Sequence, residues 1–183
     1  MQQINKVDET TVSAETAEML AAVKTQMGMV PNIISTMANS SATLGTYLGM
    51  SGALGSGKLS PKLREQIALT AAGANTCDYC ASVHTAVGGQ LSIDAEELAL
   101  NLRGKSSDAR TNEALTLVSE IIENRGHISN DRLNYLRSNG FADEEILEIF
   151  SNTMLNMFTN YFNHMAGTEI DFPVVNTSDL VAA

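Results

Sequence analysis

The amino-acid sequence predicts an all-α fold from three observations. Ala and Leu are the two commonest residues, only three prolines occur in 183 residues, and few segments alternate in polarity as strands do. Hydrophobic residues make up 44% of the chain, enough for a buried core, and no linker or low-complexity block divides it. We therefore expect one helical domain over residues 1–183.

The N-terminal third is expected to hold a polar arm and three helices. Residues 1–12 are polar and predict a loose arm. Ser13 is placed to cap a helix that Gly28 ends, a short helix opens at Pro31, and another runs to about Leu54. Three glycines at helical spacing on this last helix either let another helix approach closely or only weaken it: Gly45, Gly49 and Gly52.

The centre of the chain, residues 60–90, predicts a helix hairpin. Ser60 can cap its first helix, with Pro61 at the first helical position, where a missing N–H costs nothing. The apolar pattern breaks from residue 73 to residue 76, and a second helix, capped by Asn75 or Thr76, is expected from Cys77 to Val87. Two glycines at positions 88 and 89 are expected to end it.

The C-terminal half predicts four further helices and an extended tail. Ser92 is expected to cap the first, and the others span residues 108–124, 129–138 and 143–165. The tail from residue 170 has β-like residues together with a proline, which predicts an extended strap. The longest helix is apolar on more than one side, which predicts deep burial or a covering partner subunit. We favour a homo-oligomer.

Both cysteines, one histidine and one glutamate share the hairpin. Cys77, Cys80 and His84 stand at i, i+3 and i+7 of the second helix, on one face. If the hairpin turns near Asn75, Glu65 and His84 both lie about 14–15 Å from the turn and are level with each other. The spacing predicts that a carboxylate, an imidazole and two thiols meet in one cleft.

These residue types indicate a cysteine redox site. A thiol reacts as its thiolate, and a helix N-terminus, a neighbouring thiol and a histidine each lower the pKa of a cysteine. The helix N-terminus favours Cys77 as the more acidic thiol, whereas the nearness of His84 favours Cys80. The pattern alone leaves both assignments open.

Plainer interpretations stand beside this one. The two cysteines, His84 and Glu65 could form a zinc site, although structural zinc sites usually use two separated ligand pairs, so we expect no metal. His84 could be a core histidine and Glu65 a surface carboxylate. His127 is expected in a solvated loop. His164 is expected to be buried and satisfied, or to reach the site.

Charge and cysteine usage exclude several classes of protein. A formal net charge of −10 argues against nucleic acid or an anionic membrane as the partner. Two cysteines three residues apart do not form a secreted disulfide framework, and no apolar segment resembles a signal peptide or a membrane span. We expect a cytoplasmic protein.

Glu65, Cys77, Cys80 and His84 at this spacing resemble the signature of the alkylhydroperoxidase D (AhpD-like) branch of the carboxymuconolactone decarboxylase superfamily. The segment CDYCASVHT is similar to its core, and NYFNHMAGTEIDFP resembles the ending of an uncharacterised peroxidase-related subgroup. Tyr79 stands where the best-known members have a second histidine. The resemblance implies an orthogonal helical bundle that assembles as trimers or hexamers.

The resemblance also implies roles for the residues. Cys80 attacks the peroxide and becomes a sulfenic acid, and Cys77 resolves it as a Cys77–Cys80 disulfide. His84 is the base for the Cys80 thiol, and Glu65 completes the proton relay. Tyr79 either closes the pocket, binds a substrate oxygen or only packs.

The implied activity is an antioxidant peroxidase, a disulfide oxidoreductase that needs no cofactor. It would reduce hydrogen peroxide or organic hydroperoxides with an external dithiol or thioredoxin-like donor. The alternatives are a lyase of the carboxymuconolactone decarboxylase type and a non-enzymatic redox sensor.

Overall fold

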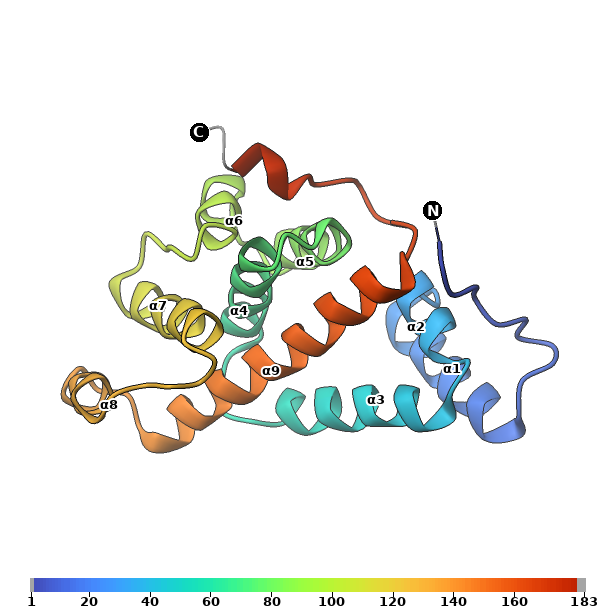
Figure 1. The fold of residues 1–183 in the computed structure, drawn as a ribbon, viewed down its shortest axis with the longest axis horizontal. Coiled ribbons are helices and arrows are strands. Elements are labelled where there is room, and N and C mark those ends of the chain that lie inside the picture. The colour runs from blue at the N-terminus through green and yellow to red at the C-terminus, as the bar shows by residue number, and fades with distance from the viewer. Residues whose placement is uncertain (1, 181–183) are drawn as a thin grey trace.

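The computed structural model describes residues 2–180, which form helices and loops without a strand. Figure 1 shows the arrangement of the elements. In chain order they are α1 Ala14–Met27, α2 Asn32–Met37, α3 Ser41–Gly55, α4 Pro61–Ala74, α5 Asp78–Gln90, α6 Ala95–Asn101, α7 Ala109–Glu123, α8 Asn130–Ser138, α9 Asp143–Ala166 and a 3₁₀ turn η1 Thr177–Leu180. The predicted all-α class is confirmed. None of the described helices has the length and apolar character that crossing a bilayer requires.

Helix α4 lies at the centre of the fold and packs against α5, α6, α7 and α9. Its Leu69 and Ala72 belong to a hydrophobic cluster shared with α1, α2, α3 and α5, whereas its Ile67 belongs to a second cluster with α7, α8 and α9. These side chains emerge from different sides of α4, so each side of the helix is buried in a different cluster. Glu65, on the same helix, is therefore fixed by two cores at once.

The caps confirm most of the expected helix boundaries. Ser13, Ser60, Asp108 and Ser129 each accept a hydrogen bond from a backbone N–H in the first turn of the helix that follows. Gly28, with a φ of 78°, ends α1.

The expected cap at Ser92 is wrong. Ser92 has a φ of 58° and lies in the turn after α5. Asp94 caps α6 instead, because its carboxylate accepts from the N–H of Glu97 at 2.8 Å and its charge suits the positive end of the helix.

Three glycines that were expected to break or end helices, at positions 73, 88 and 89, lie inside them. A Cβ at Gly73 would come within 1.8 Å of the Leu102 carbonyl oxygen, and one at Gly88 would come within 2.7 Å of the Leu98 side chain. Both allow α6 to approach the hairpin closely, so α4 runs on to Ala74 and α5 to Gln90. The glycines of α3 differ, since a Cβ at Gly45, Gly49 or Gly52 would meet no described atom within 4 Å.

The N-terminal arm is anchored, which corrects the expectation of a loose segment. The N–H groups of Gln3 and Ile4 donate to the Ala166 carbonyl at 2.7 and 3.1 Å, and the N–H of Val7 donates to the Ser35 carbonyl at 3.0 Å. The last carbonyls of a helix have no partner within it, so the end of α9 offers acceptors to the arm. The polar composition of the arm did not reveal these partners.

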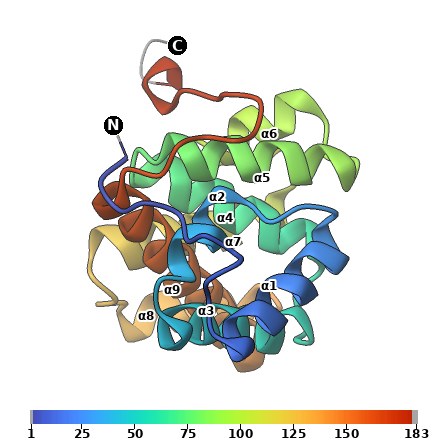
Figure 2. The same cartoon turned by 90° about the vertical axis from the view of Figure 1, so that its right-hand side faces the viewer.

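The tail forms the expected strap, here called the C-terminal strap, residues 167–176. It runs along α5, as Figure 2 shows. The N–H of Val175 donates to Ser82 at 2.9 Å, and the N–H of Thr177, just beyond it, donates to Asp78 at 2.8 Å. Residues 181–183, at the end of the predicted tail, lie outside the described residues.

Candidate active site

The hairpin turn places its functional side chains on facing helices. Asn75 ends α4 as its C-cap, Thr76 takes a φ of 52°, and Cys77 is the N-cap residue of α5. The expectation that Asn75 or Thr76 caps the second helix is therefore wrong by one or two residues. Helix α4 carries Glu65 and α5 carries Cys80 and His84.

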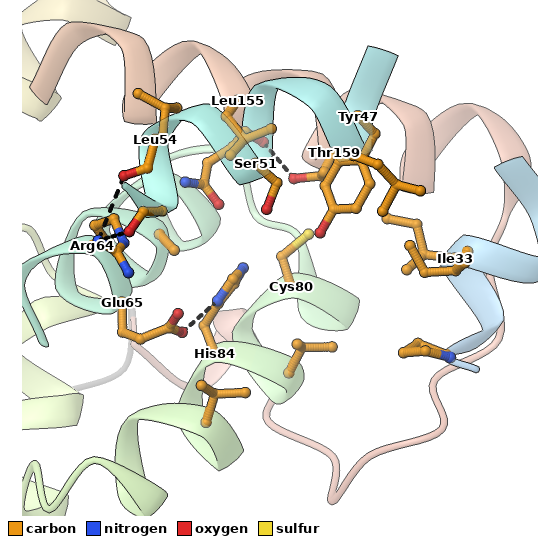
Figure 3. Close-up of a pocket in the computed structure, with 18 of the residues that line it drawn as sticks. Ile33, Tyr47, Ser51, Leu54, Arg64, Glu65, Cys80, His84, Leu155 and Thr159 are labelled. Atoms are coloured by element: carbon orange, nitrogen blue, oxygen red, sulfur yellow. Dashed lines mark hydrogen bonds and ion pairs between the residues drawn. The ribbon is translucent and has the colours of Figure 1, made fainter. Parts of the chain in front are cut away.

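Glu65 and His84 form a hydrogen-bonded pair, as their level positions predict. Oε2 of Glu65 and Nδ1 of His84 are 2.7 Å apart, and their side chains are 19% and 22% exposed. The carboxylate accepts from Nδ1, which orients the ring and leaves Nε2 free for proton transfer. Figure 3 shows the imidazole between the Glu65 carboxylate and the side of the cavity where Cys80 lies.

The two cysteines are both buried free thiols, with exposed fractions of 1% for Cys77 and 3% for Cys80. The hydrogen bond from the Cys77 thiol lowers the pKa of Cys80, and amide and hydroxyl groups of α9 add to this against the opposing effect of burial. The same hydrogen bond and burial raise the pKa of Cys77. Of the two thiols, Cys80 is thus the one poised to ionise.

Helix α9 supplies the residues that sequence reasoning missed. Nδ2 of Asn163 donates to the Cys80 sulfur at 3.2 Å, and Asn160 and Thr159 also lower the pKa of Cys80. All three side chains are buried. The signal was present in the sequence, since four asparagines recur every three or four residues along one face of the helix: Asn152, Asn156, Asn160 and Asn163.

A cavity of about 630 Å³, here called the chamber, opens onto this site. Its lining comes from α1, α2, α3, α4, α5 and α9 and includes Glu65, Cys80 and His84 but not Cys77. Much of the wall is apolar, as in cavities that bind small organic molecules. The chamber therefore gives a small molecule access to the Cys80 sulfur.

Tyr47 of α3 closes the chamber opposite α5. Its hydroxyl points toward the Cys80 sulfur in Figure 3. Burial raises the pKa of Tyr47, and the negative charges of Glu65 and Cys80 raise it further, so the phenol stays protonated. A protonated phenol beside a thiolate is a hydrogen-bond donor. Sequence reasoning missed this residue as well.

Tyr79 supports the fold around the site. Its hydroxyl donates to Oδ1 of Asp171 in the C-terminal strap at 2.8 Å and accepts from the N–H of Ile33 at 3.2 Å. Tyr79 lines the chamber, but its hydroxyl is already used by these two hydrogen bonds within the protein. His164 is exposed, neither satisfied in the core nor part of the site, and His127 is exposed in a loop as expected.

The described residues contain no group of three or more His, Cys, Asp and Glu side chains placed to hold a metal ion. The zinc alternative requires such a set.

Comparison with known proteins shows which proteins the chain is similar to. The sequence profile of the Carboxymuconolactone decarboxylase family matches residues 42–123, which span α3 to α7. An uncharacterized peroxidase-related protein from Silicibacter sp. TM1040 has 26% identity and a TM-score of 0.79, with coverage of 91% of this chain and 89% of the other. The chain is thus similar to the Carboxymuconolactone decarboxylase family over residues 42–123 and to a peroxidase-related protein over most of its length.

Other solved structures share the fold. The alkylhydroperoxidase AhpD core of a peroxidase-related protein from Ralstonia eutropha JMP134 has a TM-score of 0.85 at 19% identity, over 93% of this chain and 92% of the other. A variant of the debrominase Bmp8, in complex with 2,3,4-tribromopyrrole, has a TM-score of 0.78 at 14% identity, over 100% and 97%. No curated protein matches the sequence.

Proposed function

We propose that this AhpD-like chain is a thiol peroxidase that reduces hydrogen peroxide or organic hydroperoxides and has an antioxidant role. One observation carries the proposal: Cys80, whose pKa is lowered, lines the chamber, whereas Cys77, whose pKa is raised, lies buried beside it. A thiolate that faces a cavity is a nucleophile, and a neutral thiol at its side is placed to resolve the product.

In the proposed first step, the Cys80 sulfur attacks one oxygen of the peroxide. An S–O bond forms and the O–O bond breaks, so sulfur is oxidised by two electrons and the peroxide is reduced to an alcohol or water. His84, oriented by Glu65, takes the thiol proton and returns it to the leaving oxygen. Tyr47, across the chamber, donates a hydrogen bond to that oxygen as its charge develops.

In the second step, the Cys77 sulfur attacks the Cys80 sulfenic acid. The S–O bond breaks, a disulfide forms and water leaves with the Cys77 proton. An external dithiol or thioredoxin-like donor then reduces the disulfide by thiol–disulfide exchange and is itself oxidised. The cycle returns both thiols without a prosthetic group.

Mass spectrometry after a brief peroxide pulse tests this cycle. The parent should lose two hydrogens across the cysteine pair, the Cys77→Ser variant should gain one oxygen on Cys80, and Cys80→Ser should not react. His127→Asn, a change at an exposed loop histidine, is the matched control and should behave as the parent does. If Cys80→Ser reduces peroxide as fast as the parent, the proposal is wrong.

Two other chemistries can be tested with other substrates. The family profile favours a lyase of the carboxymuconolactone decarboxylase type, and incubation with the lactone would detect it. The apolar wall of the chamber would also accept an aromatic ring, and because the debrominase Bmp8 has a similar fold, a brominated pyrrole would test for debromination. A redox sensor, by contrast, would form its disulfide slowly and show no turnover with any donor.

We also propose that the protein self-associates through α9. Five large apolar side chains of this helix are 37–64% exposed, and they recur along it: Leu147, Phe150, Phe158, Tyr161 and Met165. An apolar stripe of this kind is usually covered by a partner. The family resemblance favours a trimer or a hexamer.

A further inference from the structure

Two amides on the buried face of α9 hold polar atoms that have no partner within residues 2–180. Asn163 uses Nδ2 to donate to the Cys80 sulfur at 3.2 Å, which leaves its Oδ1 unpaired. Nδ2 of Asn160 makes no hydrogen bond of ordinary geometry either, although its amide lies near enough to Cys80 to lower the pKa of that thiol. The two residues are 4% and 0% exposed, so water does not readily satisfy these atoms. An unpaired buried donor or acceptor in a native protein calls for a reason.

The orientation of the Asn160 amide is fixed by the hairpin turn. Nδ2 of Asn75 donates to Oδ1 of Asn160 at 2.9 Å and also to the Ala71 carbonyl at 3.0 Å. Because a carbonyl accepts from it, this atom of Asn75 must be the nitrogen, and its partner on Asn160 must be the oxygen. The free atom of Asn160 is therefore a donor.

Neighbouring amides of α9 behave differently. Nδ2 of Asn152 donates to the Glu148 carbonyl and Nδ2 of Asn156 to the Asn152 carbonyl, both within the helix. Asn160 and Asn163 make no such bond within α9. Their free donor and free acceptor lie on the part of the helix that surrounds Cys80, and both residues lower the pKa of that thiol.

We propose that Asn160 and Asn163 form a binding niche for the oxygen atom that Cys80 acquires, an inference that rests on the proposed peroxidase chemistry. When the O–O bond breaks and the S–O bond forms, Nδ2 of Asn160 donates to the new oxygen. The sulfenic O–H then donates to Oδ1 of Asn163. One donor and one acceptor match a sulfenic acid, whose oxygen both accepts and donates.

The niche protects the intermediate as well as stabilising it. Over-oxidation requires the sulfenic acid to react with a second peroxide, whereas resolution requires it to wait for Cys77. An oxygen held against α9 is turned away from the apolar wall of the chamber. Asn160 and Asn163 thereby favour the disulfide over the sulfinic acid.

The test uses the full chain in a Cys77→Ser background, in which the sulfenic acid cannot be resolved. Asn160→Ala and Asn163→Ala are compared with the Cys77→Ser parent. Thr153→Val is the matched control, because Thr153 is buried on the same helix and bonds only to the Ile149 carbonyl. After a fixed peroxide dose, mass spectrometry quantifies sulfenic acid, trapped by a cyclic diketone, and sulfinic acid.

We expect each asparagine variant to raise the ratio of sulfinic to sulfenic acid roughly fivefold, the effect of one lost hydrogen bond. The pH midpoint of Cys80 alkylation should also rise by about one unit, a change that a purely structural role would not produce. Thr153→Val should change neither. If the alanine variants fold poorly, Asn75→Ala releases the Asn160 amide from outside the niche and should raise the ratio too.

The outcomes separate the niche from the peroxidase function. Unchanged ratios and midpoints in the asparagine variants, with peroxide still consumed, would overturn the niche and leave the function standing. If Cys80 takes no oxygen in the Cys77→Ser parent, the function fails first and the niche with it.

Discussion

The two faces of α9 have the opposite polarity from that of an ordinary surface helix. The inward face carries six buried polar side chains: Asn152, Thr153, Asn156, Thr159, Asn160 and Asn163. The outward face carries the exposed apolar stripe from Leu147 to Met165. A helix selected only to stabilise a monomer would place these sets the other way round. The difference indicates that each face serves something beyond the fold of one chain.

The inward face itself divides into two parts. Asn152, Thr153 and Asn156 bond to carbonyls one turn back and so satisfy themselves. Asn160 and Asn163 instead direct polar atoms toward Cys80 and the hairpin turn. Buried polar groups of the first kind form their hydrogen bonds within α9. Those of the second kind need hydrogen-bond partners outside α9, at the hairpin and its reactive thiol. The comparison makes four predictions.

The largest effect is expected from a charge on the inward face. Asn163→Asp keeps the shape but replaces the donor to Cys80 with a carboxylate, and a like charge within 4–6 Å raises a thiol pKa by about two units. The rate constant for reaction with peroxide at pH 7 should fall about 100-fold. Because the pKa of Cys80 is lowered in the parent, the parent should hold its rate to lower pH than the variant does.

Stopped-flow kinetics from pH 6 to pH 10 would measure this. The difference in rate constant between Asn163→Asp and the parent should shrink as rising pH restores the Cys80 thiolate of the variant. A deficit of constant size across that range would show that Asn163 acts through the structure alone.

The outward face should respond to charge through assembly. Phe158→Glu removes the burial of one aromatic side chain from the proposed interface, worth about 2 kcal/mol, and should raise the subunit dissociation constant about 30-fold. Light scattering after size-exclusion chromatography would show a shift to smaller species. Lys24→Glu on α1 is the control for an added negative charge. If the mass of Phe158→Glu equals that of the parent across a dilution series, the apolar stripe of α9 does not form the subunit interface.

A smaller effect is expected across the chamber from the inward face. Tyr47→Phe removes the hydroxyl that faces Cys80, and with it one hydrogen bond to a charged oxygen, so the peroxide rate should fall about tenfold. Cys80 alkylation by an uncharged reagent should fall less, because no oxygen leaves in that reaction. Equal losses in both reactions would show that Tyr47 acts on the Cys80 thiolate rather than on the leaving oxygen of the peroxide.

The smallest effect comes from the polar cluster around Glu97, which lies outside the chamber. Burial alone would raise the pKa of Glu97, but hydrogen bonds from Ser106, Ser107 and Asn101 lower it to about 2. The folded pKa lies below the unfolded value of about 4.3, so this carboxylate stabilises the protein above about pH 4, and the contribution is lost as pH falls toward 2. With screening by solvent, Glu97→Gln should cost about 1 kcal/mol at pH 7.

Urea unfolding of parent and Glu97→Gln at pH 7 and pH 3 would measure the change. The difference between them should shrink at pH 3. The peroxide rate should not change, because Glu97 lies outside the chamber. A loss of peroxidase activity with Glu97→Gln would show that this structural cluster also affects the reaction, which would contradict the separation of structural from reactive polar groups.

The local parts of the site were predictable from the sequence. The cap at Ser60 and the level placement of Glu65 and His84 follow from helical periodicity over stretches of fewer than about 30 residues. The errors at Ser92 and at the two tightly packed glycines arose where packing between helices overrode local propensity. Neither error moved the reactive residues.

The sequence by itself determined which residues share the hairpin, because helix geometry links positions a few residues apart. Only the tertiary structure decided that the pKa of Cys80 is lowered and that of Cys77 is raised. Asn163 lies 83 residues from Cys80 along the chain, and the two meet because α4 and α5 pack against α9. The pKa of a buried thiol depends on the donors around it, and donors from distant segments are fixed by packing rather than by periodicity.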